Sequence, residues 1–217
     1  MEKNDRRLAI LAGVAALVLL VGGVGIYLFQ QSRSDAKAYE FKGGFWTPPH
    51  IATDLALTDQ NGQPFSLEDH KGKVILLYFG YTYCPDYCPT TMSDFMQVKE
   101  QLGDRANDVE IVFVSVDPER DTPARIKEYL GFFDPSFIGL TGTEDQPAPI
   151  ERDYAVSVSK DSATPISAGS SFYLVSHSTS LYAIDQSGNL RLTWAYGTSP
   201  ADVTSDVTYL LDHPDAG

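Results

Sequence analysis

This sequence has only 2 cysteines among its 217 residues, beside 3 methionines and 2 tryptophans. So few cysteines exclude a small fold held together by several disulfides, and stability must come from a packed core. Apolar residues make up 43% of the chain and charged residues only 21%, which suits such a core and excludes wholesale disorder. Two cysteines still suffice for one disulfide or for one pair of soft metal ligands.

Basic residues are also scarce, with 16 Lys+Arg against 29 Asp+Glu and a formal net charge of −13. Proteins that bind nucleic acid neutralise its phosphates with clustered lysines and arginines. The composition therefore argues against a nucleic-acid partner. The length corresponds to one domain with additional segments.

Charge is absent from residues 8–29, a stretch of 22 residues that follows Lys3, Arg6 and Arg7. As a helix it would be about 33 Å long, enough for the roughly 30 Å hydrocarbon core of a bilayer. The alternative is a cleaved signal peptide, but its apolar part is usually only about 7–15 residues long, and no small-residue cleavage site follows here. We therefore expect a single-pass inner membrane protein, with the N-terminus in the cytoplasm and the rest in the periplasm or an equivalent space.

The chain divides by composition into four parts: a cytoplasmic N-terminus (1–7), a transmembrane anchor (8–29), a linker rich in Ser, Gly and Pro (30–49) and one domain (50–217). Residues 38–217 contain 11 Lys+Arg and 26 Asp+Glu, a net charge of −15. The exported part is thus an acidic domain held at a membrane.

Hydrophobic patterns predict an α/β fold, a mixed sheet flanked by helices with an N-terminal hairpin. Asn61-Gly62 is a typical hairpin turn. Two uninterrupted apolar runs, 74–79 and 111–116, are typical of central strands buried on both faces. We expect helices near 92–102, after Thr122-Pro123, near 149–154 and after Ser199-Pro200, and further strands at 172–175, 181–184 and 190–194.

Both cysteines lie between the first apolar run and the helix pattern after it, in Cys84-Pro85-Asp86-Tyr87-Cys88-Pro89. A thiol at a helix N-terminus lies near unpaired N–H groups, which lowers its pKa. A disulfide here would close a ring of only about five residues and would add little stability. That disfavours a purely structural role and leaves an electron-shuttling dithiol or a soft metal site for Cu(I) or Zn, with imidazole as the natural third ligand.

Four histidines are candidates for that third ligand. His50 and His213 lie in the linker and the C-terminal tail, and His70 lies in a charged segment that predicts an exposed turn. His177 lies between two predicted strands, on a loop of the kind where functional groups gather in α/β sheets. The spacing alone favours His177 but does not establish it as a ligand.

Three separated segments resemble the Sco (SenC) family of copper chaperones in sequence order: Tyr83-Cys84-Pro85-Asp86-Tyr87-Cys88-Pro89, residues 115–122, and His177-Ser178 followed by residues 185–188. The resemblance covers about residues 50 to 212. It implies a thioredoxin-like fold in which Cys84, Cys88 and His177 bind one copper per chain. It also implies a role in maturing the dinuclear copper centre of cytochrome c oxidase. Whether Cu(I) alone or also Cu(II) is carried stays open.

The sequence departs from the family at Ser176, where an Asp often precedes the histidine, so a carboxylate from that neighbour is in doubt. We interpret Asp117, Glu119, Arg120 and Asp121 as exposed charges at a capped helix start, and Asp86 as a loop residue that is not a ligand. The segment Asp161 to Ser171, rich in Ser and Ala, predicts a mobile loop before His177.

We expect a metallochaperone rather than an enzyme, with three kinds of partner. These are the copper-accepting subunit of cytochrome c oxidase, a copper donor, and a thiol reductant in the same compartment. The alternative is a membrane-anchored thiol–disulfide oxidoreductase with Cys84 and Cys88 as its catalytic pair. Against it, three residues separate the cysteines instead of the usual two, and no proline lies between Phe172 and Leu181 to face the dithiol. A copper or redox sensor is a third reading, but for a sensor we would expect an appended regulatory domain, whereas we expect only the anchor and a short linker before the compact domain.

Overall fold

The computed structural model describes residues 17–25, 39–161, 164–167 and 170–214. For residues 164–167 and 170–172 it describes the backbone only. The chain forms two compact units, Met1–Glu40 and Phe41–Gly217. In the first unit, residues 17–25 are helical. Among the residues that the structure describes, no helix is both long and apolar enough to cross a membrane. Most of the expected anchor, namely 8–16 and 26–29, lies outside the described residues.

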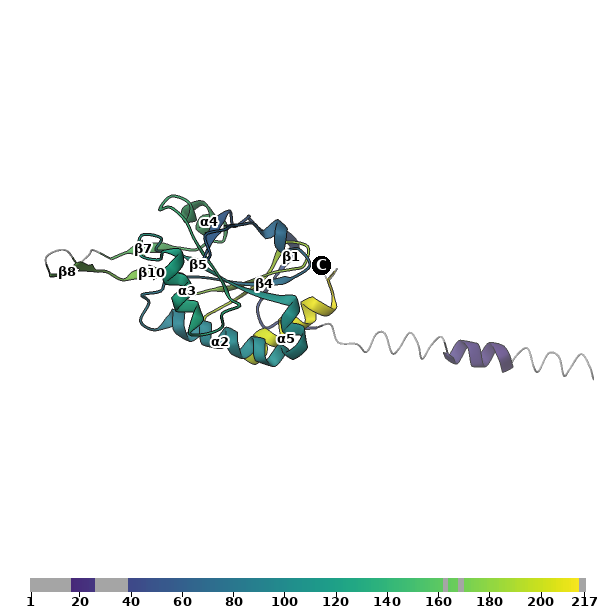
Figure 1. Ribbon diagram of the computed structural model, residues 1–217. Coiled ribbons are helices and arrows are strands. Elements are labelled where there is room, and N and C mark those ends of the chain that lie inside the picture. Colours follow the sequence, from purple (N-terminus) through teal and green to yellow (C-terminus); the bar gives the residue numbers. More distant parts are fainter. Residues whose placement is uncertain (1–16, 26–38, 162–163, 168–169, 215–217) are drawn as a thin grey trace, which may run out of the picture. The chain divides into compact units, whose positions relative to one another are not determined.

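An eight-stranded mixed sheet organises the second unit, in the order β1-β12-β11-β4-β5-β6-β2-β3 (Figure 1). Strand β5 pairs in parallel with β4 and β6, and β11 pairs antiparallel with β4. The strands are β1 (Gly44–Ile51), β2 (Leu57–Asp59), β3 (Pro64–Phe65), β4 (Val74–Gly80), β5 (Val109–Ser115), β6 (Ile138–Thr141), β11 (Leu181–Ile184) and β12 (Asn189–Trp194). The mixed sheet and its N-terminal hairpin, β2–β3, confirm the predicted fold class.

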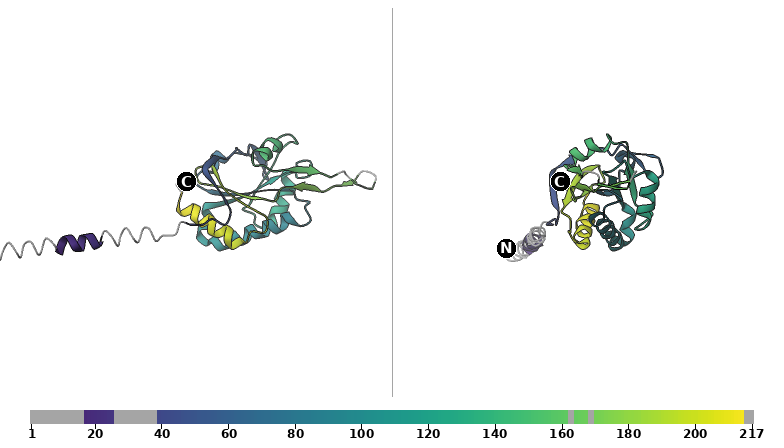
Figure 2. Two further views of the ribbon diagram at one scale, coloured as in Figure 1. Left: turned by 180° about the vertical axis from the view of Figure 1, so that it is seen from behind. Right: turned by 90° about the vertical axis from the view of Figure 1, so that its left-hand side faces the viewer.

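Helices cover both faces of this sheet. They are α2 (Tyr87–Leu102), α3 (Pro123–Gly131), α4 (Pro147–Asp153) and α5 (Pro200–Asp212). Helices α2 and α5 lie side by side on one face, and α4 lies over the opposite face (Figures 1 and 2). Two predicted helix starts are confirmed. Thr122 and Ser199 are each followed by a proline at the first helical position, and the side chain of each accepts a backbone N–H from the first turn of its helix.

Strand β4 forms the centre of the core. All seven of its residues are buried, as the uninterrupted apolar run predicted. Side chains alternate between the two faces of a strand. Phe79 accordingly contacts Tyr154 at the end of α4, while Tyr78 lies against Cys88 of α2. Tyr78 therefore connects the central strand of the sheet with the first turn of α2.

The linker was predicted to extend to Pro49, and that boundary is wrong. Residues 44–51 form the edge strand β1, which pairs with β12. The prediction failed because Pro48 and Pro49 are unusual inside a strand. An edge strand nevertheless tolerates proline, because one side of its backbone needs no hydrogen-bond partner. The unit starts at Phe41, next to a point where buried Asp206 accepts the backbone N–H groups of Lys42 and Gly43.

A two-stranded extension projects from the body of the unit (Figure 1). It consists of β7 (Val158–Lys160) paired with β10 (Val175–His177), and of β8 (Thr164–Ser167) paired with β9 (Ser170–Phe172). The predicted strand at 172–175 is wrong, because residues 173–174 separate β9 from β10. Of the mobile loop predicted at 161–171, residues 164–167 form β8 and residues 170–171 belong to β9, while 162–163 and 168–169 lie outside the described residues. Backbone pairing across the extension imposes strand structure where polar composition suggested none.

Candidate metal centre

Three separate elements bring the predicted ligands together. Cys84 lies in the loop after β4, Cys88 is the second residue of α2, and His177 ends β10, where it pairs with Val158. His177 is therefore a strand residue and not the loop residue that the sequence suggested. One ligand atom from each of the three lies within 4.8 Å of the others, and no other such group occurs among the described residues.

The sulfur atoms lie at the N-terminus of α2. The backbone N–H of Cys88 donates to Sγ of Cys84 over 3.4 Å, so the thiol accepts one of the free N–H groups of the first helical turn. Sγ of Cys88 lies 3.5 Å from Nε2 of His177. This geometry places two soft sulfur ligands and one imidazole nitrogen around a common point.

The imidazole of His177 is oriented by the backbone. Its Nδ1 lies 2.8 Å from the carbonyl oxygen of Ser178, an arrangement in which Nδ1–H donates and Nε2 keeps its lone pair for a metal. Ser176, at the position where the family often has Asp, is exposed. A carbonyl therefore supplies the orienting contact that a neighbouring carboxylate would otherwise provide.

The two thiols have opposite acidities. A hydrogen bond from Cys88 lowers the pKa of Cys84 to about 4, assisted by His177 and by backbone N–H groups, although partial burial opposes the shift. Burial raises the pKa of Cys88 well above its ordinary value. The pair thus holds one proton, with the thiolate on the more accessible Cys84.

Cys88 is fully buried, whereas Cys84 and His177 are half-buried. A hollow of about 410 Å³ opens on Cys84 and His177, and Asp86, Tyr87 and Asp161 lie along its wall. A metal or an incoming ligand therefore reaches the centre from the side of Cys84 and His177.

Gly80 allows Cys88 to approach the sheet. A Cβ atom at Gly80 would lie 3.0 Å from Sγ of Cys88, 2.7 Å from the Tyr78 ring and 2.9 Å from the Phe113 ring. Real Cβ atoms rarely come so close to several atoms at once. The end of β4 is therefore shaped to hold this sulfur.

The segment 117–121 corrects a prediction, because two of its charges are buried. Asp117 accepts the hydroxyl hydrogen of Tyr173 over 2.7 Å and pairs with Arg120. Asp121 accepts the backbone N–H and the hydroxyl of Thr82, over 3.0 Å and 2.6 Å. Sequence reasoning missed these contacts because both partners come from other segments. The contact of Asp121 with Thr82 holds the residues before Cys84 to the loop after β5. The contact of Asp117 with Tyr173 holds the segment before β10 to the same loop.

The remaining polar candidates lie outside the centre. Asp86 is exposed and makes no capping bond to α2, which agrees with its assignment as a non-ligand. His50 is exposed on β1, and His213 stacks on Tyr209. His70, predicted in an exposed turn, is instead half-buried, with Nδ1 2.5 Å from Glu110.

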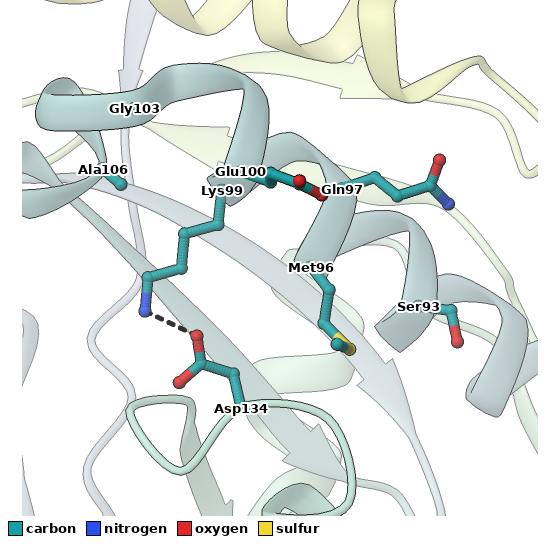
Figure 3. Close-up of a pocket in the computed structure, with 8 residues that line it drawn as sticks. All are labelled: Ser93, Met96, Gln97, Lys99, Glu100, Gly103, Ala106 and Asp134. Atoms are coloured by element: carbon teal, nitrogen blue, oxygen red, sulfur yellow. Dashed lines mark hydrogen bonds and ion pairs between the residues drawn. The ribbon is translucent and has the colours of Figure 1, made fainter.

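A larger hollow, about 660 Å³, lies along α2 beyond its first turns (Figure 3). Lys99 and Asp134 form an ion pair of 2.8 Å within it. None of the three ligands lines this hollow, so volume alone does not locate the chemistry of this protein.

The fold and the site together define a thioredoxin-like domain with a soft metal centre. Residues 47–212 match the SCO1/SenC family. A "SCO2-like protein" of Rickettsia felis is 34% identical over 194 residues, which are 88% of this chain and 92% of that protein. The chain therefore belongs to the SCO1/SenC family, and the resemblance seen in the sequence is confirmed.

Solved structures agree with this assignment. Copper-bound ScoI of Bradyrhizobium japonicum is 36% identical, with a TM-score of 0.64, over 73% of this chain and 98% of that one. Apo Sco1 of Thermus thermophilus is 32% identical, with a TM-score of 0.70, over 81% of this chain and all, 100%, of that one. Copper is thus bound by a relative, and the donor atoms found here suit the same metal.

Proposed function

We propose that this protein is a copper chaperone that binds one copper through Cys84, Cys88 and His177. We propose further that it delivers this copper to the dinuclear centre of cytochrome c oxidase. The observation that carries the proposal is the convergence of two sulfurs and one imidazole nitrogen within 4.8 Å, from a loop, a helix and a strand. Membership of the SCO1/SenC family supports the choice of acceptor, namely the copper-accepting subunit of the oxidase.

The donor set suits Cu(I) best. Two thiolates are soft ligands, imidazole also suits copper, and with Cu(I) the three ligands give a net charge of about −1. The N-terminus of α2 offsets this charge because its unpaired N–H groups carry partial positive charge. Structural zinc sites are usually closed by four protein ligands, and only three converge among the residues that the structure describes.

The exposure of the ligands supports transfer by ligand exchange. An acceptor thiolate or imidazole can approach through the hollow at Cys84 and His177, while buried Cys88 is the last ligand to release. A three-coordinate centre leaves room for that incoming ligand. Copper then moves through shared intermediates without being set free in solution.

Copper binding is coupled to thiol oxidation. Neither cysteine takes part in a disulfide in this structure. Joining them in a disulfide would release two electrons and the single proton that the pair holds, and would remove two of the three ligands. Outside the cytoplasm, the chaperone therefore depends on a thiol reductant as well as on a copper donor.

One observation favours a second function, the thiol–disulfide oxidoreductase. An accessible thiolate at Cys84 beside a buried, protonated Cys88 is also the arrangement of an attacking and a resolving thiol. In that function Cys84 would attack a partner's disulfide, and Cys88 would then release the reduced partner.

The localisation is proposed from the sequence. The uncharged stretch 8–29 supports an inner membrane anchor, with residues 50–217 in the periplasm or its equivalent. Fractionation of cells that express the full chain tests this proposal. Extraction into the soluble fraction by alkaline carbonate would overturn the anchor.

Titration of the reduced protein with Cu(I), against a chelator of known affinity, tests the main proposal. We expect one tightly bound Cu(I) per chain and none after oxidation to the disulfide. The same preparation is then assayed for turnover of a protein disulfide in the presence of excess reductant. Catalytic turnover without stoichiometric copper binding would replace the chaperone by the oxidoreductase.

A further inference from the structure

Tyr78 contacts two of the three metal ligands, although it lies in the apolar run of β4 and offers no ligand atom itself. Its side chain is fully buried, with 0% exposure. The sequence predicted only that Tyr78 belongs to a buried central strand, 74–79, because nothing in such a strand distinguishes a packing tyrosine from a functional one. Only the position of its hydroxyl in the fold makes that distinction.

The hydroxyl of Tyr78 donates to Sγ of Cys88 over 3.6 Å. A phenol keeps its proton at neutral pH, so Tyr78 acts towards the sulfur as a hydrogen-bond donor. Thr91 also lies beside the hydroxyl, but its own hydroxyl hydrogen is donated to the carbonyl of Tyr87 over 2.9 Å. Thr91 is therefore not a competing donor to the Tyr78 oxygen, and the hydrogen bond that Tyr78 donates is the one to the sulfur of Cys88.

The ring of Tyr78 also contacts the imidazole of His177. Their centroids lie 6.0 Å apart at an interplanar angle of 73°, and a second tyrosine, Tyr81, contacts the imidazole at 5.8 Å and 86°. Edge-to-face contacts of this kind restrict how an aromatic ring can turn. Gly80 keeps this region open, because a Cβ there would collide with both the Tyr78 ring and Sγ of Cys88.

We propose that Tyr78 is a positioning residue of the metal centre: its hydroxyl tunes the donor strength of the Cys88 sulfur and its ring fixes the imidazole of His177. The inference rests on the proposed copper function and deepens it. A hydrogen bond to a metal-bound thiolate draws electron density from the sulfur and so alters the metal–sulfur bond. Tyr78 supplies this hydrogen bond from the interior, where water cannot compete for the sulfur.

The variant Tyr78→Phe removes only the hydroxyl and keeps the ring. Its matched control is Tyr129→Phe, because Tyr129 is also buried and its hydroxyl has no hydrogen-bond partner among the described residues. Both variants and the wild type are reduced, loaded with Cu(I) and compared in two measurements. The first is Cu(I) affinity by chelator competition, and the second is the wavelength of the near-ultraviolet thiolate-to-copper charge-transfer band.

We expect Tyr78→Phe to bind Cu(I) about tenfold more weakly, because the buried Cys88 thiolate that the metal requires loses the hydrogen bond that stabilises its negative charge. Its charge-transfer band should move to longer wavelength, because a thiolate without the hydrogen bond gives up electron density more readily. Tyr129→Phe should match the wild type in both measurements. The band position reports on the sulfur itself, so a general loss of stability would not produce the shift. Circular dichroism measures that stability separately.

Equal affinity and equal band position in Tyr78→Phe and the wild type would overturn the role of Tyr78 while leaving the copper site in place. The same shift in Tyr129→Phe would also overturn it, because Tyr129 interacts with both cysteines only through space, so the effect would not depend on the hydrogen bond from Tyr78. Absence of Cu(I) binding by the wild type would overturn the proposed function and this inference with it.

Discussion

Nε2 of His177 lies 3.5 Å from Sγ of Cys88, although 89 positions separate the two residues in the sequence. The contact exists because β10 projects its last residue towards the first turn of α2, and the carbonyl of Ser178 turns Nε2 to the sulfur. A metal ligand set assembled from such distant segments depends on the whole domain being folded.

His177→Ala should weaken Cu(I) binding by more than the roughly tenfold to hundredfold that follows loss of a residue behind a ligand. The variant removes the only nitrogen of the ligand set. Chelator competition measures the change, and His50→Ala is the control because His50 is exposed on β1, outside the cluster. Equal affinities for His177→Ala and the wild type would remove His177 from the site.

In the reduced, metal-free protein, Cys84 should react with iodoacetamide well below neutral pH. Its reactivity should fall by half at about pH 4, because the hydrogen bond from Cys88 stabilises the Cys84 thiolate. Cys88→Ala removes that donor and should shift the midpoint upwards. Mass spectrometry after timed alkylation follows both changes, and denatured protein supplies the reference. A midpoint in the folded protein equal to that of the denatured chain would contradict the assignment.

Gly80→Ala should lower both stability and Cu(I) affinity. The added Cβ would lie 3.0 Å from Sγ of Cys88 and closer still to two aromatic rings, so the sulfur or the rings must move. Overpacking of this kind typically costs about 1–3 kcal/mol. The measurements are urea unfolding and Cu(I) competition.

The matched control for that change is Gly131→Ala, since a Cβ at Gly131, the last residue of α3, meets no atom within 4 Å. It should leave copper affinity unchanged and stabilise the fold by up to about 1 kcal/mol, because alanine favours helix. Equal effects of the two substitutions would show that the approach of Cys88 to Gly80 has no part in the site.

Asp121→Ala should destabilise the domain, because it leaves buried donors without their acceptor. Each such donor typically costs about 1–3 kcal/mol. The carboxylate of Asp121 is fully buried and accepts the backbone N–H and hydroxyl of Thr82 and the hydroxyl of Ser115. Chemical unfolding measures the loss, with Asp145→Ala as the control because Asp145 is exposed. A loss no larger than that of the control would show that the buried contacts are not needed.

Much of the fold could be predicted from local patterns. The apolar run in β4, the turn at Asn61-Gly62 and the proline-led start of α3 each depend on neighbouring residues, and each is confirmed. Prediction failed where distant pairing decides the structure. Strand β1 is exposed and contains two prolines, and β8 and β9 are polar, so only their partners make them strands.

The site divides in the same way. By itself, the sequence determined the cysteine pair at a strand–helix junction, the candidate histidine and the family, because these are properties of short segments in a fixed order. Only the tertiary structure decided that His177 meets the cysteines, that the pKa of Cys84 is lowered, and that the hydroxyl of Tyr78 lies against Cys88. It also decided that Asp117 and Asp121 are buried. Burial and hydrogen bonding across the sheet set these features, and they exist only once β4, α2 and β10 pack together.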